Sequence, residues 1–335
     1  MESLRIFLLD VPAVALAWLG RQGTRAIAAL VFIGIAIPPI DALLKPFVME
    51  AIFVLLCIAF LRVDLAALRG HLGKPAVMLA ATAWTMLVIP TLFGASCLVA
   101  GLEACSPDLL LAFMLQAVAS PMMAAPALAA LMGLDATLVL VTLIASTALT
   151  PFTAPMFAYV FIGRALTISP LALGLKLFAI LSGSLLVGAM IRRITGPTAI
   201  QKYKDEIDGF NILVVFVFVA AVMENVAARF LAKPMVMIGL AAIAWGIFFV
   251  VFGLTTLVFA RAGWARAFVL GLMVSQRNMG LMLAATAGAL PDLAWLYFAL
   301  SQFPIYLSPQ LLRPMARRLV AHPQIMPRSA SKVQT

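Results

Sequence analysis

The sequence has little charge for its length. Only 11% of its 335 residues are Asp, Glu, Lys or Arg, whereas an average soluble domain carries roughly 25%. So few charges exclude a water-soluble globule. Apolar residues make up 64% of the chain, and they form runs of about 20, the length that crosses the hydrocarbon of a bilayer as a helix. We therefore predict an all-α polytopic membrane protein.

Cysteine and histidine are also scarce. Cys57, Cys97 and Cys105 form no CxxC pair and leave one cysteine over in any pairing, which excludes a disulfide framework. His71 and His322 lie in a predicted loop and in the C-terminal tail, and the sequence contains neither an HExxH motif nor a Gly-rich phosphate loop. We expect no enzyme activity, no metal site and no cofactor.

Acidic residues are outnumbered, 13 against 23 basic ones, which gives a formal net charge of +10. The basic residues lie in short segments between the apolar runs, as the cytoplasmic loops of a membrane protein require. The charge therefore indicates orientation and not a nucleic-acid partner. Alternating apolar and polar stretches are lacking too, which excludes a transmembrane β-barrel.

The apolar runs predict ten transmembrane helices. Their ranges are 26–44, 46–62, 75–99, 108–132, 135–162, 170–191, 209–230, 234–260, 265–290 and 292–315. Ile6–Leu19 is short for a span and contains Asp10 and Pro12, so we predict an interfacial helix there. The predicted organisation is a cytoplasmic N-terminal segment (1–25), a first five-helix repeat (26–162), an outside linker (163–169), a second five-helix repeat (170–315) and a cytoplasmic tail (316–335).

The distribution of basic residues predicts the orientation. With a cytoplasmic N-terminus, most of them fall inside, and the outside segments hold only Lys45, Arg164, Arg229 and Lys233. By the positive-inside rule both termini are cytoplasmic. We expect a multi-pass protein of the inner or plasma membrane.

Spans four and nine resemble each other at an offset of 155 residues (267 − 112). The shared residues are Ala112, Phe113, Leu115, Ser120, Leu128, Ala129, Ala130 and Gly133, which meet Ala267, Phe268, Leu270, Ser275, Leu283, Ala284, Ala285 and Gly288. Because five spans precede the second unit, the two repeats cross the membrane in opposite directions. Inverted repeats are typical of secondary transporters, whose binding site lies near the midplane between the repeats.

The middle of span four reads Ser120-Pro-Met-Met-Ala-Ala-Pro126. Pro121 and Pro126 have no N–H group, so we expect the carbonyls of Ala117 and Met122 to lose their helical partners. Unpaired backbone at this depth is tolerated only where it is buried in protein or lines a cavity. A simple proline kink and an unwound segment both fit span four alone.

Span nine favours the unwound segment. At the equivalent depth it carries Ser275-Gln276-Arg277-Asn278, followed by Gly280. An Arg at the centre of a membrane helix costs about 2.5–3.5 kcal/mol on insertion scales, so it should face protein or water. Four consecutive polar residues would face every side of a regular helix, and an unwound segment accommodates them better.

With these features the chain resembles the bile acid:sodium symporter family, in the wider group that includes arsenite and auxin efflux carriers. The resemblance rests on the ten-span plan and on Ile37-Pro-Pro39, Lys45-Pro46, Ser120-Pro121, Gly133 and Arg277-Asn278-Met-Gly280. It implies a panel of spans one, two, six and seven against a core of spans three to five and eight to ten. In that core the broken spans four and nine cross at the midplane.

The chain departs from the family where sodium binds. The resemblance places a Ser-Asn pair at Pro126 and Ala127, which have no side-chain oxygen, and a Glu and a Gln at Met273 and Arg277. We therefore expect the family's sodium sites to be lost, although a symporter with rebuilt sodium sites stays an alternative. Arsenite carriers resemble one another in a cysteine within span four, which is absent here because Cys105 lies before that span. We therefore do not expect arsenite to be the substrate.

The crossing of the two spans is the predicted substrate site. Its candidate residues are Arg277, Asn278, Gln276, Ser275, Ser120 and Gln116. The guanidinium of Arg277 has two compatible roles: its five N–H groups can satisfy freed carbonyls of span four, or its fork can bind a carboxylate or sulfonate.

Glu224 and Glu50 are proton-coupling candidates on the predicted panel. A carboxylate in a low-dielectric site is protonated more readily and could carry a proton in place of sodium. The alternative is that Glu224 pairs with Arg229 and that Glu50 pairs with Lys45 through water.

These features predict a secondary active transporter of a small organic anion that works by alternating access. A non-transporting membrane sensor on the same fold is the alternative, and its usual mark would be an attached signalling domain, for which the tail is too short. The expected partners are the anion and the lipid bilayer, and a homodimer is left open.

Overall fold

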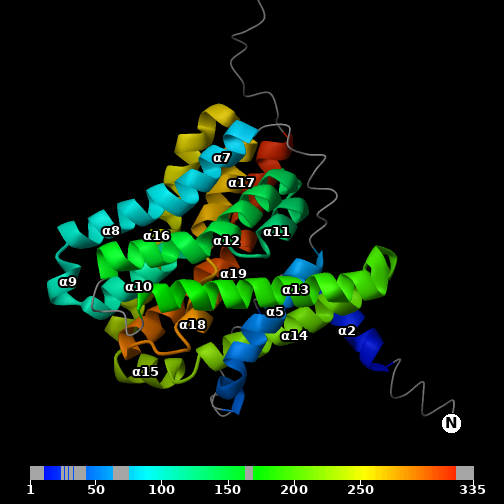
Figure 1. The fold of residues 1–335 in the computed structure, drawn as a ribbon, viewed down its shortest axis with the longest axis horizontal. Coiled ribbons are helices and arrows are strands. Elements are labelled where there is room, and N and C mark those ends of the chain that lie inside the picture. Colours follow the sequence, from blue (N-terminus) through cyan, green and yellow to red (C-terminus); the bar gives the residue numbers. More distant parts are fainter. Residues whose placement is uncertain are drawn as a thin grey trace, which may run out of the picture.

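The computed structural model describes residues 11–23, 43–62, 75–162 and 169–321, with the single positions 26, 29 and 33. Within these ranges the regular structure is helical and contains no strand (Figure 1). The predicted all-α class is therefore confirmed. Most of predicted span one, its Ile37–Pro39 motif, His71 and His322 lie outside the described residues.

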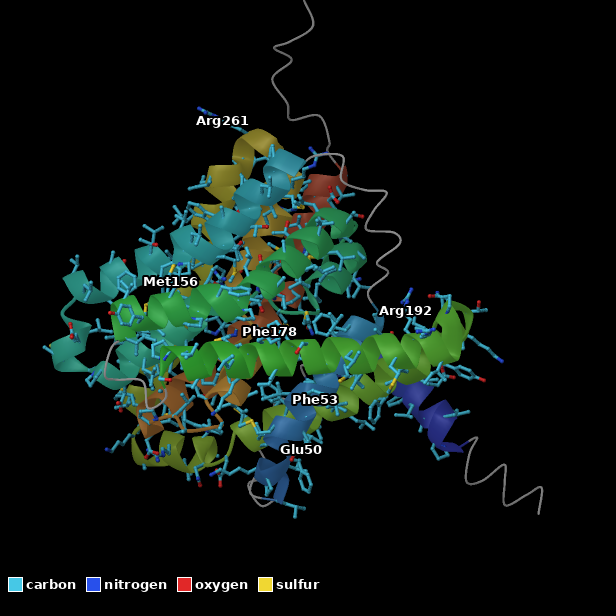
Figure 2. The ribbon with its side chains drawn as sticks, in the orientation of Figure 1. Glu50, Phe53, Met156, Phe178, Arg192 and Arg261 are labelled. Atoms are coloured by element: carbon cyan, nitrogen blue, oxygen red, sulfur yellow. The ribbon has the colours of Figure 1, made fainter. Side chains whose placement is uncertain are left out.

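Five described helices are long and apolar enough to cross a membrane, and they match predicted spans three, five, six, seven and eight. They consist of α7 (Pro75–Ala83), η3 (Trp84–Val88) and α8 (Ile89–Val99); α12 (Ala136–Phe157) and η4 (Ala158–Ile162); α13 (Pro170–Lys202); α14 (Lys204–Val222) and α15 (Val226–Ala232); and α16 (Pro234–Phe259) with η6 (Ala260–Ala262). Large apolar side chains such as Met156 and Phe178 are exposed on their surfaces, as a lipid environment allows (Figure 2). The chain thus has the helices of a membrane protein.

The remaining predicted spans correspond to shorter or longer helices. Span two is η2 (Lys45–Phe47) with α5 (Val48–Arg62), and span ten is the 30-residue α19 (Asp292–Ala321). A four-residue helix, α9 (Leu102–Cys105), precedes span four.

Spans four and nine are each split into two helices of matching length. Span four consists of α10 (Pro107–Val118) and α11 (Ala125–Leu131), and span nine of α17 (Trp264–Ser275) and α18 (Met279–Ala285). The first helix has 12 residues and the second has 7 in both cases. Each pair is followed by a glycine in the left-handed region, Gly133 at φ 71° and Gly288 at φ 70°. These glycines are separated by the offset of the sequence repeat, 155 residues (288 − 133).

The helices pack as two groups (Figure 1). We call α2 (Val11–Gln22), α5, α13 and α14 the four-helix group, because they contact one another most extensively. The second group, which we call the crossover group, contains α7, α8, α10–α12 and α16–α19. The two groups meet where α12 and α18 contact α13, where α18 contacts α5, and where α14 contacts α19.

The N-terminal helix α2 is held on α14 by close backbone contact. It overlaps the predicted interfacial helix over residues 11–19 and ends later, at Gln22, while residues 6–10 of that prediction lie outside the described residues. A Cβ at Gly209 of α14 would lie 1.9 Å from the carbonyl oxygen of Leu16, and one at Gly20 of α2 would lie 2.0 Å from the carbonyl oxygen of Asp205. Small residues permit such close approach, as in pairs of membrane helices.

We expect Gly209→Ala to destabilise the protein, because the added methyl group has to displace α2. Overpacking of this kind typically costs about 1–3 kcal/mol. The control is Gly239→Ala on α16, where a Cβ would meet no atom within 4 Å. Thermal unfolding of the purified variants measures the effect, and equal stability of the two would contradict the close contact of α2 and α14.

Candidate functional site

The two interrupted helices cross at their unwound segments and pair through the backbone. Pro121 and Arg277 form an isolated antiparallel bridge. The N–H of Met122 donates to the carbonyl of Gln276 at 2.8 Å, and the N–H of Asn278 donates to the carbonyl of Ser120 at 2.8 Å. Each break thus supplies the hydrogen-bond partners that the other needs, which a membrane interior demands. We call residues 119–124 and 276–278 the crossover.

The structure adds a partner to the proline prediction at Met122. Its carbonyl lacks the helical partner, as predicted, but it is not left unpaired, because it accepts from the N–H of Ala125 at 3.0 Å. A tighter turn before α11 replaces the helical bond that Pro126 cannot make. Pro126 lies in the first turn of α11 and Gly280 in the first turn of α18, so both begin a helix just after the crossover.

Arg277 is buried at the crossover, with 3% of its surface exposed. Its Nη1 donates to the carbonyl of Ala119 at 2.9 Å and to that of Thr85 at 3.3 Å, and its Nη2 also donates to Thr85 at 3.3 Å. Among the described residues no Asp or Glu forms an ion pair with it. The crossover therefore holds a buried cation whose protein partners are backbone dipoles alone.

The carbonyl of Thr85 is free to bind Arg277 because of a π-helical turn, η3. The N–H of Ile89 bonds to Trp84, five residues back, instead of to Thr85. The next residue that could reach Thr85 in this register is Pro90, which has no N–H. Three segments far apart in sequence, at residues 85, 119 and 277, are joined in this way.

The polar neighbours of Arg277 tie the crossover to α19. The side-chain amide of Gln276 donates to the carbonyl of Ile305 at 3.1 Å and to the hydroxyl of Ser308 at 3.2 Å. The hydroxyl of Tyr297, also on α19, donates to Oε1 of Gln116. These bonds hold both breaks against one continuous helix.

Two further candidates have different surroundings. The side chain of Asn278 accepts from the N–H of Leu281 at 3.2 Å and so caps α18. The hydroxyl of Ser120 is fully buried and has no partner among the described residues. The hydroxyl of Ser120 and Oε1 of Gln276 are therefore unused hydrogen-bonding groups among the described residues, whereas the side chain of Asn278 is used to cap a helix.

The crossover has two faces with different neighbours. On one face Gln116, Ser275 and Arg277 line a small pocket together with apolar residues of α8 and α16. On the other, a Cβ at Gly280 would lie 3.4 Å from Phe218 of α14 and 3.6 Å from Ile52 of α5. The predicted site residues are therefore divided between a pocket within the crossover group and a contact with the four-helix group.

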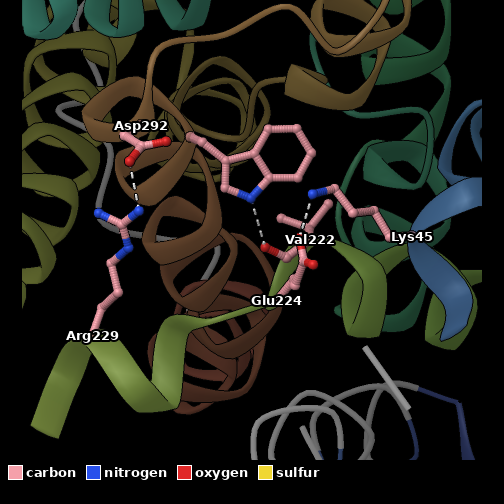
Figure 3. A network of polar contacts seen from close by, with 6 residues as sticks. Lys45, Val222, Glu224, Arg229 and Asp292 are labelled. Carbon is pink, nitrogen blue, oxygen red and sulfur yellow. Dashed lines mark hydrogen bonds and ion pairs between the residues drawn. The ribbon is translucent and has the colours of Figure 1, made fainter. Parts of the chain in front are cut away.

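Glu224 lies apart from the crossover, in a polar network at the turn between α14 and α15 (Figure 3). It pairs with Lys45 at 2.6 Å, and Arg229 pairs with Asp292 at 2.6 Å. The alternative reading, in which Glu224 pairs with Arg229, is therefore wrong, and Lys45 has Glu224 as its direct partner. The left-handed conformation of Asn225 (φ 61°) ends α14 and redirects α15.

The network also joins the two helix groups. The indole N–H of Trp295, on α19, donates to the carbonyl of Val222 at the end of α14 at 3.2 Å (Figure 3). Glu50 is exposed in the first turn of α5 (Figure 2). The proton-coupling role of both carboxylates stays a prediction.

Comparison with known proteins assigns no family. No family model matches the chain, and no curated protein matches it significantly. The resemblance drawn from the motifs therefore remains an expectation.

Sequence reasoning missed Thr85 and Tyr297. Pro90 was the available signal for the first, because a proline within span three frees a carbonyl one turn earlier. A single buried tyrosine in an apolar helix gives no comparable signal, although its hydroxyl needs a partner.

We expect Arg277→Met to destabilise the protein by about 1–3 kcal/mol for each carbonyl left without a donor. Arg277→Lys keeps the charge but loses the planar fork that reaches Thr85 and Ala119 together, so it should lose less. Arg193→Met, at an exposed position of α13, is the control. Thermal unfolding of the three variants tests this, and wild-type stability of Arg277→Met would show that the guanidinium does not hold the crossover.

The Lys45–Glu224 pair predicts a charge-swap result. Lys45→Glu and Glu224→Lys should each lower the unfolding free energy by up to about 1 kcal/mol, since the pair is partly exposed. The double variant should recover most of the loss. If the double variant loses as much unfolding free energy as the two single variants together, the ion pair contributes nothing to stability.

Proposed function

We propose that this chain is a secondary active transporter of a small organic anion that works by alternating access. The observation that carries the proposal is the crossover: two interrupted helices that pair through their backbones around a buried cation, which has no acidic partner among the described residues. Broken helices of this kind form the binding sites of many secondary transporters.

The inverted repeat is supported by the matching geometry of the two interrupted spans. The 12- and 7-residue helices occur in the same order in both, and each pair ends at a left-handed glycine. The four-helix group matches the predicted panel in α5, α13 and α14, and the crossover group matches the predicted core.

Contacts between helix ends that are predicted to lie on the same side of the membrane support the ten-span topology. Arg62 pairs with Asp208 at 2.7 Å, and Arg192 donates to the carbonyl of Leu61, so the predicted inside end of α5 adjoins the inside parts of α13 and α14. The predicted outside residues Lys45 and Glu224 meet near the opposite end of α5, where Glu50 also lies (Figure 2).

An anionic substrate follows from the charge at the crossover. A charge in a low-dielectric interior acts over longer distances than in water, so Arg277 favours an anion on either face. The face toward α5 and α14 presents Ile52 and Phe218 around Gly280, so we propose a substrate with an apolar body there. Movement of the four-helix group against this face would expose the substrate to each side in turn.

Sodium coupling is not part of the proposal. Arg277 already occupies the freed carbonyls of Thr85 and Ala119, and a guanidinium repels a second cation. The coupling of transport, if any, resides in other groups.

Uptake into proteoliposomes tests the proposed function. We expect accumulation of at least one member of a panel of short and medium-chain carboxylates, aryl sulfonates and taurocholate, with no uptake of glucose or choline. Arg277→Gln removes the charge and should reduce anion uptake at least tenfold. Uptake of choline but of no anion by the wild-type protein would contradict the assignment.

Replacing sodium by potassium or choline at constant ionic strength should leave uptake unchanged. Sodium prefers oxygen ligands, and the guanidinium of Arg277 stands where the resemblance places one of them and repels a cation. A saturable sodium requirement would mean that other oxygen atoms, such as the buried hydroxyls of Ser146 and Thr147, form a rebuilt sodium site.

The natural cysteines test the orientation. Cys105 is exposed, whereas Cys57 and Cys97 are buried. An impermeant maleimide should therefore label intact cells at Cys105, and Cys105→Ser should remove the label. In that background Lys204→Cys should react only after permeabilisation, and the reverse pattern would invert the proposed topology.

A further inference from the structure

The pocket beside Arg277 is small and partly open, and residues of the crossover group line it. Its polar lining is Gln116, Ser275 and Arg277, which are all buried, and the rest of the wall is apolar, including Phe93 and Val251. It has room for about one water molecule. An organic anion does not fit there, but a single atom or a water molecule does.

The side chains of this pocket offer mainly donors, while an acceptor is present in the backbone carbonyl of Ala117, which Pro121 leaves without its helical partner. Tyr297 donates to Oε1 of Gln116, which leaves the amide N–H groups of Gln116 for another partner. Arg277 uses three of its five N–H groups on Thr85 and Ala119. The hydroxyl of Ser275 donates to its own helix, at the carbonyl of Leu272.

In the part of the chain that the structure describes, no acidic side chain compensates the charge at the pocket. The ion pairs formed within the described residues all lie away from Arg277. Carbonyl dipoles and the C-terminal end of α10 offset part of the cost of burying the guanidinium. A full counter-charge would offset more, because unpaired charges are the most costly groups to bury.

From these observations we propose that the pocket binds a monatomic anion of the size of chloride as the resident counter-ion of Arg277. The anion is held by the guanidinium and by the side-chain amide of Gln116, which Tyr297 orients. This site is separate from the proposed substrate face, and its test does not depend on transport. Because both anions interact with the single charge of Arg277, chloride and the proposed substrate should compete. Its occupancy stabilises the crossover.

Thermal unfolding of the purified full-length chain tests the proposal. At constant ionic strength, replacing gluconate by chloride should raise the midpoint in a saturable way, because a ligand that binds the folded state stabilises it. Bromide should act like chloride, and sulfate, which is too large, should not. Equal midpoints in gluconate and chloride would overturn the proposal.

Two variants separate the site from general salt effects. Gln116→Leu removes the amide donors and should weaken the apparent chloride affinity about tenfold or more. Gln302→Leu is the matched control, because Gln302 is also a buried glutamine but bonds to Phe298 within α19. Unchanged chloride affinity in Gln116→Leu would contradict the proposal.

Diffraction from crystals grown in bromide gives a result that needs no variant. An anomalous peak within hydrogen-bonding distance of Arg277 and Gln116 is expected. A water molecule there instead, bridging these donors and the carbonyl of Ala117, would overturn the proposal even if Gln116→Leu fails to fold.

Discussion

The organisation of this protein depends on one requirement: backbone groups at membrane depth need hydrogen-bond partners within the protein. Two helices are interrupted at equivalent places, and each break leaves N–H and carbonyl groups without helical partners. The crossover satisfies them by pairing the two breaks with each other, through Met122 with Gln276 and Asn278 with Ser120. The interruption of one helix is thus stable only because the other is interrupted as well.

Arg277 extends this pairing to a third element. It binds the carbonyl that the π-helical turn releases at Thr85 and the one that the break releases at Ala119. The arginine therefore acts as a multiple donor where the chain has an excess of free carbonyls. Its charge is the by-product of that structural role, and it makes the centre of the molecule attractive to anions.

Local chemistry was enough to predict where the helices break. Proline removes an N–H wherever it occurs, and four successive polar residues conflict with any apolar helix, so the interruptions near Pro121 and Arg277 were readable from the sequence. The sequence also predicted the helical class and, within a few residues, the bounds of most spans that the structure describes.

The partners of these groups depend on how the helices lie in three dimensions, and were not predictable in the same way. The N–H of Ala125 donates to the carbonyl of Met122, and the guanidinium of Arg277 donates to the carbonyl of Ala119. After the left-handed residue Asn225, Arg229 pairs with Asp292, whereas Glu224, before it, pairs with Lys45. Neither the π-helical register at Thr85 nor the contact between Tyr297 and Gln116 leaves a periodic pattern in the sequence.

Hydrogen exchange of the protein in lipid nanodiscs tests the central claim most directly. Amides in irregular segments usually exchange quickly, but the account requires those of Met122 and Asn278 to be bonded across the crossover and buried. They should exchange as slowly as the amides of α10 and α17, and more slowly than those of Glu224 and Asn225 in the turn after α14. Exchange at the crossover as fast as in that turn would contradict the paired, buried arrangement of the two breaks.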